Sequence, residues 1–258
     1  MIRKLAKLHA EYGLYNLKLL AAESSRNIVD QLSNYPRSSY LVNYYETFIK
    51  IYKNEIKYLN KIPLSKYKTK ATRSIDLPFV GSNVIKREKA EYFFIFEGSL
   101  SHSDRLSVVV LSCLWPIQNL IKYKKIIELF WPGKGQSSYN YIIKCLGINP
   151  KIAKKAYVTD AIRIADANEK PDRRKNRELL EKEIRLFDPK YVIPVGVNAK
   201  HILGVKNIKK LGDKCKCVPF PTKFRSWENK VSADKEYRKL KKLISNSDTK
   251  KRVRLITL

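Results

Sequence analysis

The chain has 258 residues, of which 44% are hydrophobic, so it can form one medium-sized domain with an extension and a sizeable core. Lysine and arginine number 53 against 24 aspartate and glutamate residues, a formal net charge of +29, and this excess favours a polyanionic partner. The 16 interspersed tyrosines favour nucleic acid over a membrane surface, although a general lysine bias would also raise the charge. No run of eighteen apolar residues occurs, so we expect a soluble, cytoplasmic protein without a membrane span.

Residues 1–70 space their apolar side chains as amphipathic helices do, and they predict an α-helical extension. We expect His9, within the first of these helices, to lie at the surface. A second amphipathic pattern covers residues 40–62, and its tyrosines and lysines either line DNA or belong to the core.

Residues 71–105 change character and predict two strands or a hairpin. Two apolar runs, 77–83 and 92–96, flank a charged turn at 86–89. The loop that follows holds three groups capable of acid–base chemistry: Glu97, His102 and Asp104. The alternative is an exposed connecting loop without chemistry.

Residues 106–235 carry the pattern of an α/β core. The continuous apolar run 107–113 predicts the buried central strand of a parallel sheet, and Pro116 follows it. Residues 139–146 predict a helix that ends at Gly147.

The segment from residue 156 to Gly204 predicts a βαβ unit. Residues 156–164 predict a strand, a helix capped near Asp172 follows, and residues 191–196 predict a second strand. A short helix then ends at Gly204. Such a unit implies a parallel sheet with a ligand crevice at the carboxyl ends of its strands.

The order of these signals resembles the uracil-DNA glycosylase superfamily over roughly residues 106–235. The resemblance implies a three-layer α/β/α domain with a short parallel four-stranded sheet. It also implies a monofunctional DNA glycosylase that flips a non-standard base, hydrolyses its N-glycosidic bond and leaves an abasic site. No cofactor is expected. The cysteines lack the spacing of the iron–sulfur cluster that some relatives carry, so we expect no metal: Cys113, Cys145, Cys215 and Cys217.

The resemblance also assigns roles in the site. Trp115 stands before Pro116 where many relatives have Asp or Asn, which leaves Gln118 and Asn119 to position a water. Trp131 is the candidate for stacking on the flipped base. Phe220-Pro221-Thr222 occupies the place of a His-Pro-Ser-type motif, so the histidine that stabilises the departing base in relatives is missing.

Asp160 is the most informative departure, because relatives commonly have Asn after the residue that matches Thr159. An ionised Asp only accepts hydrogen bonds, so it suits the exocyclic amine of cytosine and repels O4 of uracil. We therefore favour a modified cytosine, such as glucosylated hydroxymethylcytosine, over uracil. Alternatively, Asp160 activates the water as a general base, or it only forms a turn after the strand.

Candidate DNA contacts combine basic and hydroxyl side chains around these motifs: Lys134, Ser137, Thr222, Lys223, Arg225 and Ser226. Residues 236–258 predict a basic helix and tail that add electrostatic affinity. Superfamily members that attack modified phage DNA point to antiviral defence as a setting.

Two other hypotheses stay open. The first is a catalytically inactive relative that binds DNA or a partner protein, as the changed motif residues would predict. The second is a basic flavodoxin-like domain with a small phosphorylated ligand at residues 133–138.

Overall fold

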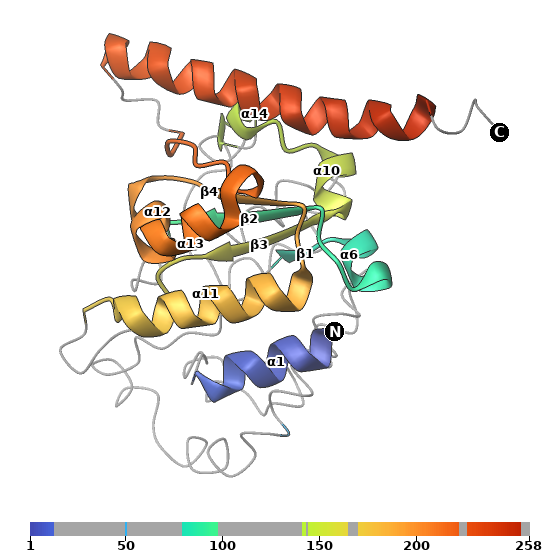
Figure 1. Ribbon diagram of the computed structural model, residues 1–258, viewed down its shortest axis with the longest axis vertical. Helices are drawn as coiled ribbons and strands as arrows, with labels where there is room; N and C mark the ends of the chain where they lie inside the picture. The colour runs from blue at the N-terminus through green and yellow to red at the C-terminus, as the bar shows by residue number, and fades with distance from the viewer. Residues whose placement is uncertain are drawn as a thin grey trace, which may run out of the picture.

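The computed structural model describes residues 1–12, 50, 79–97, 141–142, 144–164, 170–221 and 226–253. In these parts of the chain, helices cover both faces of one sheet, so the described fold is α/β (Figure 1). None of the helices described is both long and apolar enough to cross a membrane.

The sheet has the strand order β1-β3-β2-β4. Its strands are β1 (Phe79–Val80), β2 (Tyr92–Phe96), β3 (Ala156–Asp160) and β4 (Tyr191–Pro194). β2 pairs in parallel with β3 on one side and with β4 on the other, whereas β1 runs antiparallel to β3. The four named strands therefore do not make the all-parallel sheet that the sequence predicts.

β2 holds the central place in the sheet. Its five residues are all buried, and Phe94 lies opposite Val158 of β3 and Ile193 of β4. The sequence predicts a central strand at residues 107–113, which lie outside the described residues, so that prediction is not tested. The sheet also reaches back to residue 79, ahead of the expected start of the core at 106.

The two strands predicted before residue 98 are present, but they do not form the hairpin that was the alternative prediction. β1 and β2 do not pair with each other, because each pairs with β3. The charged residues 86–89, expected to form a turn, instead include the last turn of a short helix, α6 (Ser82–Arg87). Glu88 then takes a left-handed backbone conformation that ends this helix.

The βαβ unit is confirmed. Helix α11 (Arg173–Phe187) begins after Asp172, whose side chain accepts a hydrogen bond from the Lys175 N–H. Helix α12 (Val197–Leu203) ends at Gly204, where φ is 83°. The crossover passes over β2, because β2 lies between the two strands that the unit connects.

Aromatic packing holds α11 on one face of the sheet. Tyr157 of β3 stacks on Phe187 with ring centroids 4.0 Å apart, and it contacts Phe93 of β2 at 4.8 Å. Such pairs each add about 0.5–1.5 kcal/mol to the gain from burial. Helix α1 (Ile2–Glu11) lies on the outer side of α11 (Figure 1).

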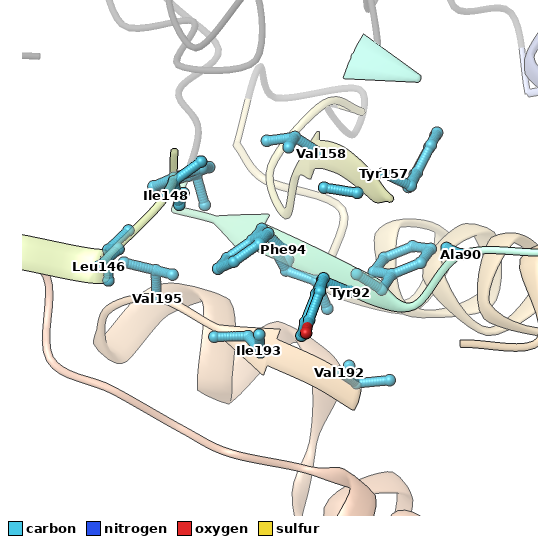
Figure 2. Close-up of a cluster of buried hydrophobic side chains, with 14 of the residues drawn as sticks. Ala90, Tyr92, Phe94, Leu146, Ile148, Tyr157, Val158, Val192, Ile193 and Val195 are labelled. Carbon is cyan, nitrogen blue, oxygen red and sulfur yellow. The ribbon is translucent and has the colours of Figure 1, made fainter. Parts of the chain in front are cut away.

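The opposite face carries α10 (Pro150–Lys154) and α14 (Trp227–Val253), and a further short helix, α13 (Val205–Leu211), follows α12 (Figure 1). Figure 2 shows Leu146 and Ile148 gathered with side chains of β2, β3 and β4 into one buried cluster. α14 adds four buried residues at helical spacing: Ala233, Tyr237, Leu240 and Ile244. The basic helix predicted within residues 236–258 is thus confirmed, and it begins earlier than expected, at Trp227.

Residues 215–218 extend the sheet beyond β4 through two isolated parallel bridges. In a strand, the N–H and C=O of one residue point to the same side. The carbonyls of Val192 and Pro194 accept hydrogen bonds from Lys216 and Val218, so the missing N–H of Pro194 faces this last segment. The proline therefore removes a donor from this pairing while it leaves the pairing with β2 intact.

Candidate functional site at the carboxyl end of the sheet

The carboxyl ends of β2, β3 and β4 meet at one end of the sheet, because the three strands are parallel. Glu97 follows β2, Thr159 and Asp160 end β3, and Gly196 lies just after β4. The chain passes from β2 to β3 on one side and then crosses back to β4 on the other. In open α/β sheets, ligands bind outside the carboxyl ends at such a reversal of strand order.

Glu97 is clamped between β2 and the start of α12. Its Oε1 accepts a hydrogen bond from the Asn198 N–H at 3.3 Å. Gly196 passes directly beneath the carboxylate with φ 97°, and a Cβ at this position would collide with it. Only glycine combines this conformation with this close approach. The sequence names Glu97 as a candidate but gives no sign of this clamp.

Asp160 and Thr159 are buried at the end of β3, with Asp160 only 2% exposed. The strand stays joined to β2 beyond Asp160, since the Ala161 N–H donates to the Phe96 carbonyl and the Ile162 N–H donates to the Glu97 carbonyl. Alternation along the strand places Thr159 on the same face as Tyr157 and Asp160 on the other. Asp160 is thus a buried acidic residue two positions before Ile162, whose N–H donates to the Glu97 carbonyl.

A second group of charged side chains is fully enclosed between α1, α11 and β3. Glu183 of α11 accepts four hydrogen bonds. Two come from Arg163 Nη1 and Nη2, at 2.8 and 2.7 Å. The others come from the Tyr157 hydroxyl at 2.8 Å and from His9 Nε2 at 2.6 Å. Glu183 and His9 have no exposed surface. The expected surface position of His9 is therefore wrong, because its ring nitrogen is a donor to a buried carboxylate.

The ionisation of Glu183 follows from these contacts. Burial by itself would raise the pKa of this carboxyl, but the charge of Arg163 and the hydrogen bonds from His9 and Arg163 lower the pKa to about 2. A carboxylate held in this way serves as an anchor for the structure rather than as a proton carrier. The sequence carries a signal for it, because Glu183 lies midway between Leu179 and Phe187 on the apolar stripe of α11.

Asn176 fixes the chain that leaves β3. Its Oδ1 accepts hydrogen bonds from the N–H groups of Arg163 and Ile164, and its Nδ2 donates to the carbonyls of Ile164 and Asp172. This buried amide holds both ends of the connection from β3 to α11. Sequence reasoning missed it, because an Asn within a helix normally faces solvent.

Most of the other predicted site residues lie outside the described residues: His102, Asp104, Trp115, Pro116, Gln118, Asn119, Trp131, Lys134, Ser137, Thr222, Lys223 and Arg225. Phe220 is described and packs, partly buried, against the main core beyond the last sheet segment. Ser226 precedes α14; its hydroxyl accepts a hydrogen bond from Asn229, and its carbonyl accepts one from the Lys230 N–H. Its hydroxyl thus takes part in the start of that helix.

The outer side of α14 is strongly basic. Its exposed cations are Lys230, Lys235, Arg238, Lys239, Lys241 and Lys242. Glu236 pairs with Lys239 at 2.7 Å. Such a surface attracts a polyanion through its charge, without reading a sequence.

Comparison with known proteins gives no assignment, since neither a family model nor a curated protein matches this chain. Within the described residues, no three His, Cys, Asp or Glu side chains come together as a metal site would require.

Proposed function

We propose that the protein is a DNA glycosylase that hydrolyses the N-glycosidic bond of a flipped, non-standard base and leaves an abasic site. The observation that carries the proposal is the pair of acidic residues Glu97 and Asp160, which end neighbouring parallel strands where the strand order reverses. A hydrolase of this kind needs a carboxylate to activate water and a group to recognise the base.

The strand order supports the likeness to the uracil-DNA glycosylase superfamily. If β2, β3, β4 and residues 215–218 are taken as the four parallel strands of a three-layer α/β/α domain, a predicted motif or polar group follows each one. Glu97 follows the first, Thr159-Asp160 ends the second, Gly196 follows the third, and Phe220 follows the fourth. In this alignment Glu97, rather than Gln118 or Asn119, takes the position of the residue that activates water.

Glu97 and Asp160 then have different roles in the reaction. Glu97 is partly exposed, so it can accept a proton from a water that attacks C1′ of the sugar. The bond from C1′ to the base nitrogen breaks, and the base departs with the bonding electron pair and takes a proton from solvent, which balances the proton that Glu97 accepts. Asp160 accepts a hydrogen bond from an exocyclic amine on the base, which favours a modified cytosine over uracil. The basic face of α14 supplies affinity for the DNA backbone.

The test is incubation with DNA that contains one modified base at a time: uracil, hypoxanthine, 5-methylcytosine, 5-hydroxymethylcytosine or its glucosylated form. Alkaline cleavage then reports abasic sites. We expect cleavage of a cytosine derivative, loss of most activity in Glu97→Gln, and a changed preference among bases in Asp160→Asn. If every DNA is bound but stays intact, the protein is a binding module and the proposal fails.

Glu91→Gln is the matched control for Glu97→Gln. Glu91 stands at the amino end of β2, where it pairs with Lys155 at 3.4 Å, and so it lies at the opposite end of the same strand. The control variant should retain wild-type cleavage. Equal loss of activity in the two variants would show that the effect comes from the strand and not from the site. Cleavage of glucosylated phage DNA would add support for a role in phage defence.

A further inference from the structure

Cys215 and Cys217 form a close pair of thiols in the last sheet segment. Both are free and partly buried, and their Sγ atoms lie 3.9 Å apart. Residues two apart in an extended segment point to the same side, so Lys216 between them faces away. The pair is therefore a built-in feature of the segment and not a chance approach of two loops.

The two thiols differ in their chemistry. The hydrogen bond with Cys215 and the charge of Lys200, against the opposing effect of burial, lower the pKa of Cys217 to about 7. The same hydrogen bond and burial raise the pKa of Cys215. Cys217 is thus the thiolate and nucleophile, and Cys215 is a protonated neighbour within reach of it.

We propose that Cys215 and Cys217 are a reversible oxidation site, in which a hydroperoxide converts the dithiol to an intramolecular disulfide. The thiolate sulfur of Cys217 attacks one peroxide oxygen, the O–O bond breaks, and the leaving oxygen takes a proton to become water or an alcohol. Cys217 is then a sulfenic acid. The Cys215 sulfur attacks it, the S–O bond breaks, and a second water leaves with the proton of Cys215. The two sulfurs lose two electrons, and the hydroperoxide gains them.

The backbone around the pair favours a bond that forms and is easily reduced. Two residues of extended chain span about 6.6 Å, which is longer than the usual separation of about 5.5–6 Å between Cα atoms joined by a disulfide. Closing the bond therefore draws the segment together and strains the hydrogen bond from Lys216 to Val192. Pro194 cannot donate a hydrogen bond to residues 215–218. This segment is therefore held to the sheet by fewer hydrogen bonds and can move more easily. Val218, the residue after Cys217, accepts a hydrogen bond from the Gly196 N–H, so the change reaches the carboxyl end of the sheet.

The test treats the full-length protein with hydrogen peroxide and then blocks and counts the thiols. Tryptic cleavage after Lys216 separates the two cysteines, so only a disulfide keeps the two fragments joined. We expect joined fragments that come apart in dithiothreitol. In Cys215→Ser, Cys217 should stop as a sulfenic acid that dimedone captures, and in Cys217→Ser the loss of thiols at this site should disappear.

Cys145→Ser is the matched control and should oxidise at residues 215 and 217 as the wild type does. Cys217→Ala serves as a second variant if the serine alters the fold, as judged by circular dichroism. Fragments that stay separate after peroxide, or a disulfide that joins two different molecules, would overturn the proposal.

Discussion

Replacing Glu183 by glutamine tests whether a buried ion pair fastens α1 and the end of β3 to α11. The substitution keeps the size of the side chain but removes its charge. It leaves the guanidinium of Arg163 enclosed without a counter-charge, and it replaces one acceptor oxygen by an amide that donates. Tyr157 and His9 also lose a charged acceptor.

The expected cost can be estimated in two ways. A pKa of about 2 against an ordinary value of 4.5 means that the folded protein favours the ionised carboxylate by about 3 kcal/mol. Removal of one partner from a buried ion pair costs about 3–5 kcal/mol. Since folded domains are stable by only about 5–15 kcal/mol, Glu183→Gln should lower the free energy of unfolding by a large fraction.

Urea denaturation, followed by circular dichroism, measures this loss. Glu178→Gln is the matched control on the same helix, because Glu178 pairs with Arg174 at the surface, where such pairs contribute about 0–1 kcal/mol. The free energy of unfolding of the control should lie within about 0.5 kcal/mol of the wild-type value. A loss below about 1 kcal/mol in Glu183→Gln would refute the view that the buried carboxylate is an anchor.

The structure makes three further predictions. The lowered pKa of Glu183 stabilises the fold fully above pH 4.5 and progressively less down to pH 2, so the midpoint of urea unfolding should fall across this window, and less in Glu183→Gln. Gly196→Ala should destabilise the fold by about 2 kcal/mol or more, because the new Cβ meets the Glu97 carboxylate at φ 97°. The loss should appear as a lower melting temperature, and a variant as stable as the wild type would contradict this geometry. Asn176→Ala should cost about 2–4 kcal/mol in urea unfolding, because two buried N–H groups lose their acceptor, whereas Asn229→Ala at the surface should cost little.

Local signals were sufficient to predict the βαβ unit. Asp172 caps α11 by accepting the Lys175 N–H, and Gly204 ends α12 with a positive φ, so each boundary rests on residues a few positions apart. The apolar stripe of α11 likewise lies within one helix. Helix boundaries of this kind depend on capping residues and glycines that can be recognised in the sequence.

The order of the strands depends on contacts that the sequence does not state. Residues 92–96 and 107–113 are both short apolar runs, and periodicity alone cannot tell which one takes the centre of a sheet. Pairing places residues 92–96 inside the sheet, since β2 has β3 on one side and β4 on the other, and residues 107–113 lie outside the described part of the chain. The hairpin prediction failed for the same reason, because both of its strands find a partner in β3, more than sixty residues away in the chain.

The buried network was missed because its members are far apart in the chain. His9 and Glu183 are separated by 174 positions, so no residue near His9 in the sequence indicates that it is buried. The charged residue on the apolar stripe of α11 was the available signal. A carboxylate at such a position requires buried donors, and the basic residue that follows β3, Arg163, was the nearest candidate in the chain.

The two sides of the carboxyl end are held to different degrees, and this difference fits the work that we propose for them. Behind Asp160, the Glu183 network and Asn176 fix the chain through buried hydrogen bonds. Beyond β4, Pro194 removes a donor, and residues 215–218 are joined to the sheet by two isolated bridges. A group that positions a base for reaction must be held rigidly, because a misplacement of about 1 Å can cost about 100-fold in rate. A segment that closes the proposed disulfide has to move, and a weakened ladder allows that movement without disturbing β2 and β3.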